Sequence, residues 1–194
     1  MLIVDSDLLM VERRLRTGEL LFPSCGAVLA PWGHGRPREI RGDLGVRRFV
    51  RPRRTRCTGY QVTHVLLPEA LWPRQLDAAE VIRAGLEITA LGMGHRQVDA
   101  HLGRADDTVR GWIRRFRRRS EDVRRYFTVA LVALADDPVM PELAPSPLSD
   151  AALAIAAAHR AAAMTWPETN TVSRWVSAGR AIDGRLLTCT SSAG

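Results

Sequence analysis

The stretch RQVDAHLGRADDTVRGWIRRFRRR, residues 96–119, decides the fold of this chain. Its pattern predicts two helices, over 95–102 and 106–119, joined by a turn at Gly103, because glycine readily adopts the positive φ that such a turn needs. In the second helix, apolar side chains recur at the i, i+3, i+4, i+7 spacing of one helix face. The sequence therefore predicts a helix-turn-helix whose second helix buries one apolar stripe. This stripe consists of Val109, Trp112, Ile113 and Phe116.

An arginine-rich face remains on the second helix once this stripe is buried. Such a face fits the major groove of double-stranded DNA, where guanidinium groups bind phosphates and the O6 and N7 atoms of guanine. Arg110 and Arg114 lie nearer the helix start and are the candidates for base edges, whereas the later arginines are expected at phosphates. The alternative is that this row of arginines is a solvated helix face. The predicted DNA-binding residues are Arg110, Arg114, Arg115, Arg117 and Arg118.

The distribution of charge also favours a polyanionic partner. The 194 residues include 28 basic residues, all of them arginine, and 21 acidic ones, which gives a net charge of +7. Residues 1–125 carry 24 of these arginines and 15 of the acids, so the positive excess lies in the first two thirds of the chain. Because such a surface attracts phosphates, nucleic acid is the expected partner.

Three carboxylates weigh against tight DNA binding. Asp99 follows Val98 at a position where the first helix of such a pair usually presents a small residue, and burial of a carboxylate there is costly. We therefore expect Asp99 to loosen the packing of the two helices. Asp106 and Asp107 begin the second helix, where they favour the helix dipole but repel phosphate.

The segment 22–68 predicts short strands joined by turns, because glycines and prolines interrupt short apolar runs. Within it, Cys25 and Cys57 each occupy half of a Cys-x-x-Cys knuckle, with Phe22 and Tyr60 in the other two cysteine positions. A structural zinc site needs four ligands. We therefore expect no cofactor; Cys25 and Cys57 are the candidate metal ligands should zinc bind, and the aromatic side chains are expected to fill the centre instead.

A second basic patch lies between the half-knuckles. Residues 36–56 contain nine arginines against only Glu39 and Asp43. This patch is either a second contact to the same DNA duplex or a solvated pair of strands, and the sequence leaves both interpretations open. His34 and His64 flank the patch, but their spacing is not that of a zinc knuckle.

The predicted fold class is α+β, with a small β-rich module followed by helices. A short amphipathic helix is expected within residues 1–20, and Asp77 is the expected N-cap of the first helix after the β-rich module. The predicted parts are a degenerate zinc-ribbon-like module over 1–70, an all-α helix-turn-helix domain over 76–137, a proline-rich linker over 138–148, and an alanine-rich helical segment with a tail over 149–194. Helices are expected over 76–92, 95–102, 106–119, 120–134, 149–164 and 171–178.

An ordered set of these motifs resembles an uncharacterised actinobacterial family. Members of that family look like a zinc ribbon joined to a transposase-type helix-turn-helix, often associated with mobile elements. The resemblance implies a DNA-binding protein that is an accessory to, or remnant of, a transposon, or a transcriptional regulator. This chain is a degenerate member, because it keeps two of four ribbon cysteines. The matching residues are the two half-knuckles, Pro31-Trp32-Gly33-His34, Thr63-His64-Val65-Leu66-Leu67-Pro68, Gly94-His95-Arg96 and the run from Thr108 to Phe116.

The sequence favours a non-catalytic protein. It contains no nucleophile elbow, no phosphate-cradling glycine loop and no His-Glu-x-x-His pair. Three scattered cysteines favour a reducing compartment, and no signal peptide or membrane span is apparent, so a cytoplasmic protein with no membrane partner is expected. The alternative function is a protein-interaction module in which the alanine-rich helix forms a homodimer and the charge maintains solubility.

Overall fold

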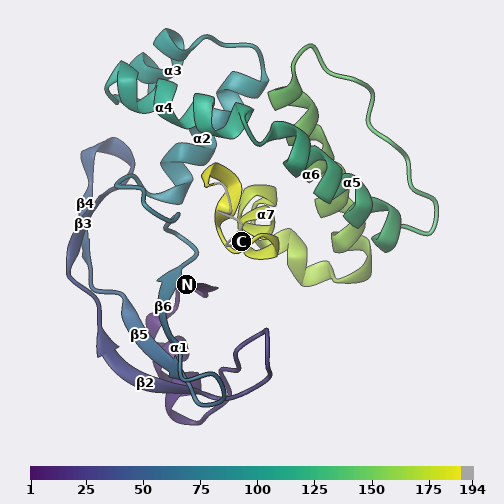
Figure 1. The fold of residues 1–194 in the computed structure, drawn as a ribbon. Coiled ribbons are helices and arrows are strands. Elements are labelled where there is room, and N and C mark those ends of the chain that lie inside the picture. Colours follow the sequence, from purple (N-terminus) through teal and green to yellow (C-terminus); the bar gives the residue numbers. More distant parts are fainter. Residues whose placement is uncertain (189–194) are drawn as a thin grey trace.

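The computed structural model describes residues 1–188, in which a β-rich module is followed by a helical domain (Figure 1). The fold class is therefore α+β, as predicted. Cys189 and the remainder of the predicted tail lie outside the described residues. None of the described helices has both the length and the apolar character needed to cross a membrane.

The β-rich module combines a four-stranded sheet with a hairpin. The sheet has the strand order β1-β6-β5-β2, in which β1 and β6 are parallel and the other neighbours are antiparallel. Strands β3 and β4 pair in a separate antiparallel hairpin, which we call the basic hairpin, and Arg41 of β3 also forms an isolated backbone bridge with Asp77. The elements are β1 (Leu2–Val4), α1 (Leu8–Arg16), β2 (Leu29–His34), β3 (Arg38–Arg41), a 3-10 turn (Asp43–Gly45), β4 (Arg47–Val50), β5 (Arg53–Cys57) and β6 (Thr63–Pro68).

A small core holds α1 against the sheet. The carboxylate of Asp7 accepts the backbone N–H groups of Leu9 and Met10, which caps the first turn of α1. The buried face of the helix carries Val11 and Leu15. Their partners in this core are Leu20, Leu29, Cys57 and Leu66.

The helical domain begins after β6. The first and last residues of its helices lie within a few residues of the predicted helix bounds. The N-cap prediction for Asp77 is wrong, because α2 begins at Ala79 and Ala78 occupies the N-cap position without a side-chain cap. The elements are α2 (Ala79–Ala90), α3 (His95–Leu102), α4 (Asp106–Arg117), α5 (Ser120–Leu134), α6 (Pro147–Thr165), a 3-10 turn (Pro167–Thr171), α7 (Arg174–Ala181) and a second 3-10 turn (Arg185–Leu187).

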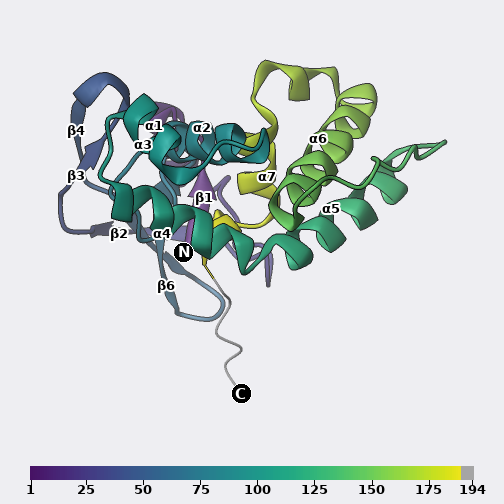
Figure 2. The same cartoon turned by 90° about the horizontal axis from the view of Figure 1, so that it is seen from above.

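The carboxy-terminal helices share the core of the helical domain. Residues 135–146 form no helix or strand and connect α5 to α6, which run side by side (Figure 2). The alanine-rich face of α6, including Ala151, Ala154 and Ala158, is buried in the same core as Trp112. This arrangement differs from the separate segment expected after residue 148. The apolar face on which the homodimer alternative depends is thus covered by the chain itself.

Helix α2 crosses both helices of the predicted helix-turn-helix at Gly85. A Cβ atom at this position would lie 3.2 Å from Cδ1 of Leu102, 3.5 Å from Cγ1 of Val98 and 3.5 Å from Cε3 of Trp112. The small residue that lets the helices approach is therefore Gly85 on α2, and not a residue of α3, where a helix-turn-helix pair usually has it. Close packing of three helices at one point depends on the missing side chain.

Substitution Gly85→Leu is expected to lower the free energy of unfolding by about 1–3 kcal/mol, because it overpacks this crossing. Urea denaturation measures the change. The control is Ala84→Leu at the adjacent, half-buried position, for which we expect a change of about 0.5 kcal/mol or less. Equal effects of the two substitutions would contradict the proposed crossing.

Candidate nucleic-acid interface

The apolar stripe of α4 faces the core, as predicted. Val109 and Phe116 are fully buried, Trp112 is 1% exposed and Ile113 is 5% exposed. The ring of Phe116 packs edge-on against Trp175 of α7, with 5.6 Å between ring centroids. The indole N–H of Trp175 donates to Glu87 on α2 at 2.6 Å, so α2, α4 and α7 are joined at this point. The rotation of α4 about its axis is therefore set by tertiary packing.

The turn between α3 and α4 has the expected geometry. Gly103 has φ of 59° and its N–H donates to the carbonyl of Asp99. Asp99 itself is only half-buried, whereas its neighbour Val98 is fully buried. The expectation that Asp99 loosens the packing is wrong, because Val98 takes the buried position and Gly85 on α2 is the small residue at the crossing.

Three of the predicted DNA-binding arginines lie free on the surface. Arg114, Arg117 and Arg118 are exposed, and their guanidinium groups make no hydrogen bond or ion pair within residues 1–188. They line a groove of about 820 Å³ between α4 and the turn that connects α2 to α3. Thr89, Met93, Gly94, His95, Asp107, Arg110, Gly111 and Ile113 complete its lining.

Two other predicted arginines are partly occupied. Arg110 lies 3.6 Å from carboxylate oxygens of both Asp106 and Asp107, although its side chain is 58% exposed. Arg115 is half-buried and donates to the Gln75 side chain at 3.5 Å. Burial lowers the pKa of Arg115, and the nearby charge of Arg114 adds to the effect. Arg115 thus differs from the three free arginines, although the sequence pattern predicts DNA contact for all four.

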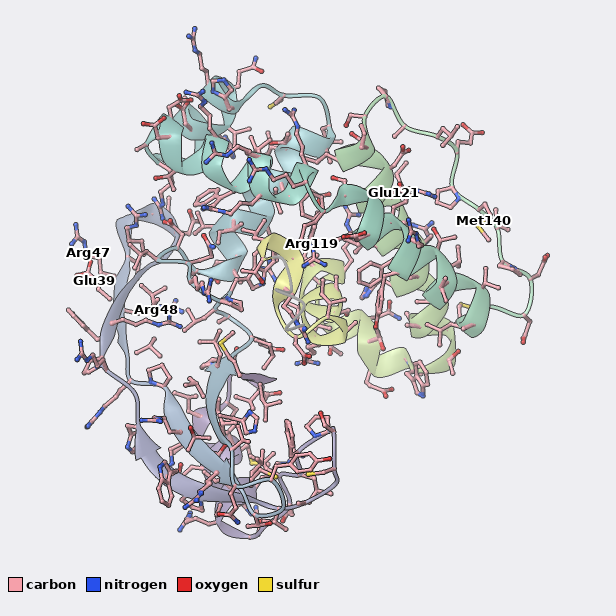
Figure 3. The ribbon with its side chains drawn as sticks, in the orientation of Figure 1. Glu39, Arg47, Arg48, Arg119, Glu121 and Met140 are labelled. Atoms are coloured by element: carbon pink, nitrogen blue, oxygen red, sulfur yellow. The ribbon has the colours of Figure 1, made fainter. Side chains whose placement is uncertain are left out.

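Arg119 shows how tertiary contacts alter the role of an arginine. Its guanidinium group donates to the backbone carbonyls of Arg185 and Thr188, at 3.0 Å for Arg185. Figure 3 shows Arg119 next to the carboxy-terminal segment, at the junction of α4 and α5. This side chain therefore holds residues 185–188 in place and does not extend the arginine face.

A contact that the sequence pattern does not predict joins the starts of α3 and α4. Nδ1 of His95 lies 2.5 Å from a carboxylate oxygen of Asp106. Both side chains are partly exposed at the edge of the groove. Asp106 thereby binds His95 and lies near Arg110, so its charge is partly neutralised within the protein. The only sequence signal for this contact is that each residue is the first of its helix.

A buried carboxylate attaches the basic hairpin to the turn between α3 and α4. Asp77 is 2% exposed and accepts hydrogen bonds at 2.8 Å from Arg41 of β3 and at 2.8 Å from Arg104. Arg104 also donates to the carbonyl of Gly42, just before the hairpin turn. Because Arg104 lies two residues before α4, these contacts set where the hairpin lies relative to that helix.

The outer surface of the basic hairpin is charged and aromatic. Arg47 lies 2.8 Å from Glu39 across the two strands, and Phe49 beside them is 80% exposed. Figure 3 shows Arg47 and Glu39 on the outer edge of the hairpin, with Arg48 on the other side of the strands. Leu44, at the tip of the hairpin, is 93% exposed and has φ of 49°. An apolar residue held in the left-handed region at an exposed tip is unusual.

The two half-knuckles come together in the β-rich module. The sulfur atoms of Cys25 and Cys57 lie 3.4 Å apart. Phe22 stacks on His64 with 4.3 Å between ring centroids and meets Tyr60 edge-on at 6.2 Å. Aromatic rings thus occupy the region where two further ribbon cysteines are expected.

The side chains in this region do not fit a zinc ion. Zinc in a structural site takes four nitrogen or sulfur ligands. Within residues 1–188, no group of three or more histidine, cysteine, aspartate or glutamate side chains is arranged to hold a metal. Cys25 and Cys57 are two thiols without further ligands, so we assign no metal chemistry to them.

Comparison with known proteins gives one similarity. Residues 22–112 match the model of a protein family described as a domain of unknown function, DUF6431. The match begins at the first half-knuckle and ends within α4, so it includes strands β2 to β6 of the β-rich module and the turn between α3 and α4 but not β1 or α1. No curated protein and no solved structure gives a significant match. The similarity carries no assigned activity.

Substitution Asp77→Ala is expected to lower the free energy of unfolding by about 3–5 kcal/mol, because it leaves the buried guanidinium of Arg104 without its carboxylate. Chemical denaturation measures this loss. Glu39→Ala serves as the control, since its ion pair with Arg47 is exposed and is worth about 1 kcal/mol or less. A similar small effect at Asp77 would show that the hairpin is not fixed by this carboxylate.

Proposed function

We propose that this protein binds double-stranded DNA by placing α4 in the major groove. One observation carries the proposal: the buried stripe of α4 leaves Arg114, Arg117 and Arg118 exposed and without protein partners within residues 1–188. Guanidinium groups on one face of a recognition helix are suited to phosphates and to guanine edges. The protein in this proposal is a non-catalytic binding protein with no cofactor, located in the cytoplasm.

The structural contacts refine the role of each arginine. Arg114 is the candidate for a base edge, since it is exposed and precedes Arg117 and Arg118 along α4. Arg117 and Arg118 lie at the end of α4 and are the candidates for phosphates. Arg110 must give up its ion pairs with Asp106 and Asp107 to bind DNA. Arg115 is half-buried and bonded to Gln75, so it stabilises the protein side of the interface.

The basic hairpin supplies a second contact to the same duplex in this proposal. The ion pairs of Asp77 hold it next to the turn that precedes α4, and Figures 1 and 2 both place it beyond the amino-terminal end of α4. Arg48 is exposed on β4 and has no side-chain partner within residues 1–188, and exposed Arg47 can reach a flanking phosphate once it gives up Glu39. Two basic elements fixed relative to each other bind a rigid duplex with less loss of conformational entropy than two mobile ones.

The biological role in this proposal follows the resemblance to zinc-ribbon and transposase-type helix-turn-helix proteins of actinobacteria. A DNA-binding protein of this kind is an accessory to, or remnant of, a mobile element, or a transcriptional regulator. The competing function, a homodimeric interaction module, loses its main support because the apolar face of α6 is buried within the chain. Binding to DNA and its dependence on salt distinguish the two.

The affinity for a fluorescent 20-base-pair duplex is expected to fall with salt. The logarithm of the association constant should fall against the logarithm of the salt concentration with a slope of about −4 to −5, because about five phosphates are neutralised. Fluorescence anisotropy between 50 and 300 mM KCl measures this slope. The double substitution Arg117→Ala and Arg118→Ala, at the two α4 positions assigned to phosphates, is expected to reduce its magnitude by about 2. Arg13→Ala with Arg14→Ala, at exposed positions on α1, removes the same charge elsewhere and should leave the slope almost unchanged. A flat response of the parent protein would exclude DNA binding of this kind.

The double substitution Arg47→Ala and Arg48→Ala tests the hairpin contact separately. We expect it to reduce the magnitude of the same slope by about 2 without changing which DNA sequence is preferred, because these arginines are assigned to phosphates. A slope equal to that of the parent would show that the hairpin does not contact DNA. The proposed contact of α4 would be unaffected by that result.

A further inference from the structure

The two cysteines of the half-knuckles form a close pair of thiols. Cys25 lies in the loop before β2 and Cys57 ends β5, yet their sulfur atoms are 3.4 Å apart although 32 positions separate them in the chain. Both are free thiols, with Cys25 exposed and Cys57 buried. Formation of a disulfide requires the sulfur atoms to approach to about 2.05 Å, a movement of about 1.4 Å that side-chain rotation can supply.

Backbone hydrogen bonds of two tight turns hold this pair in place. The carbonyl of Phe22 accepts the N–H groups of Cys25 at 3.2 Å and Gly26 at 2.8 Å. On the other side, the carbonyl of Cys57 accepts the N–H of Gln61 at 2.9 Å. The positions of both sulfur atoms therefore follow from the fold.

Gly59 allows the two turns to approach each other. A Cβ atom on Gly59 would lie 3.0 Å from the Cβ of Ala27, 3.5 Å from the sulfur of Cys25 and 3.8 Å from that of Cys57. A side chain here would push the turns apart. The glycine is thus a structural requirement of the thiol pair.

The environments of the two thiols differ. The N–H of Tyr60 donates to the sulfur of Cys57 at 3.4 Å, and this hydrogen bond, with those from Cys25 and the backbone of Gly59, lowers the pKa of Cys57 despite its burial. At Cys25, a hydrogen bond from the backbone of Ala27 lowers the pKa of the thiol. Desolvation and the neighbouring Cys57 raise it by more, so the pKa of Cys25 is raised overall. The accessible thiol is thus next to a more acidic one that is shielded from solvent.

We propose that Cys25 and Cys57 form a reversible disulfide by exchange with small-molecule disulfides such as oxidised glutathione. The thiolate of Cys25 attacks the external disulfide, forms a mixed disulfide and releases one thiolate, which takes up a proton. The thiolate of Cys57 then attacks the sulfur of Cys25 and releases a second thiolate, and the two released thiolates take up the two protons that the cysteines lost. In total, two protein thiols are oxidised, one external disulfide is reduced to two thiols, and no metal is required.

The disulfide would join the loop before β2 to the end of β5 and close a long loop of the chain. Closing such a loop stabilises the folded state, so reduction and oxidation should change the stability of the β-rich module. This inference does not depend on DNA binding, because Cys57 lies in the small core of α1 and the sheet with the exposed Cys25 beside it, and α4 belongs to the core of the helical domain. The pair is thus a site of covalent modification in its own right.

The test equilibrates the purified full-length protein with reduced and oxidised glutathione, traps free thiols with iodoacetamide and measures intact mass and peptide masses. The sequence contains three cysteines, so we expect three alkylated thiols under reducing conditions; under oxidising conditions Cys25 and Cys57 should be joined and not alkylated, and Cys189 should carry either the alkyl group or glutathione. The oxidised form should unfold about 5 °C or more higher, and dithiothreitol should reverse the shift.

Two single variants test the order of the exchange. Cys57→Ser should accumulate a glutathione adduct on Cys25, whereas Cys25→Ser should form little adduct because Cys57 is buried. Three free thiols under oxidising conditions would overturn the proposal, as would a Cys25–Cys57 bond that forms only in denaturant. Thiols protected by stoichiometric zinc in the purified protein would also overturn it.

Discussion

The burial of Trp112 and Phe116 is the interaction on which the arginine face depends. Residues 110–119 contain six arginines, whose mutual repulsion opposes any compact packing of α4. Exposed charge interactions are worth about 1 kcal/mol or less each, whereas the loss of a buried Phe or Trp side chain costs about 3–5 kcal/mol. The aromatic contacts therefore determine which face of α4 is turned inward, and the position of the charged face follows from them.

Arginine has three different roles in this protein, according to what surrounds it. Arg104 is paired with the buried Asp77 and attaches the basic hairpin to the helical domain. Arg119 donates to backbone carbonyls and fixes the carboxy-terminal segment. Arg114 and Arg117 have no such partner within residues 1–188, and they lie on the groove beside α4. The proposed function rests mainly on this contrast, because arginines with buried or backbone partners stabilise the fold and arginines without partners are available to a polyanion.

Local patterns in the sequence are sufficient to predict much of the helical domain. The stripe around Trp112 and the glycine turn at Gly103 depend on residues close together in the chain, and the structure confirms both. Asp77 was mistaken for an N-cap because its partners, Arg41 and Arg104, are far from it in sequence. Strand β1 is only three residues long, and its pairing with β6 has no local signature.

The candidate site was predictable only in part. Periodicity identified the arginine face, but it could not separate Arg115, which packs against Gln75, from Arg114. The spacing of the half-knuckles identified Cys25 and Cys57 as related positions. Their contact at 3.4 Å depends on two turns that the fold brings together, so the chemistry of the pair became apparent only in three dimensions.

In the proposed complex, α4 presents its arginines to DNA while its aromatic stripe stays buried. The arginine Nε–Hε signals, followed by NMR during titration with duplex DNA at low salt, report on these contacts residue by residue. We predict shifts for Arg114, Arg117 and Arg118, with little change at Arg124, which is paired with Glu121 on α5. Unshifted α4 arginines in the presence of saturating DNA would contradict the account.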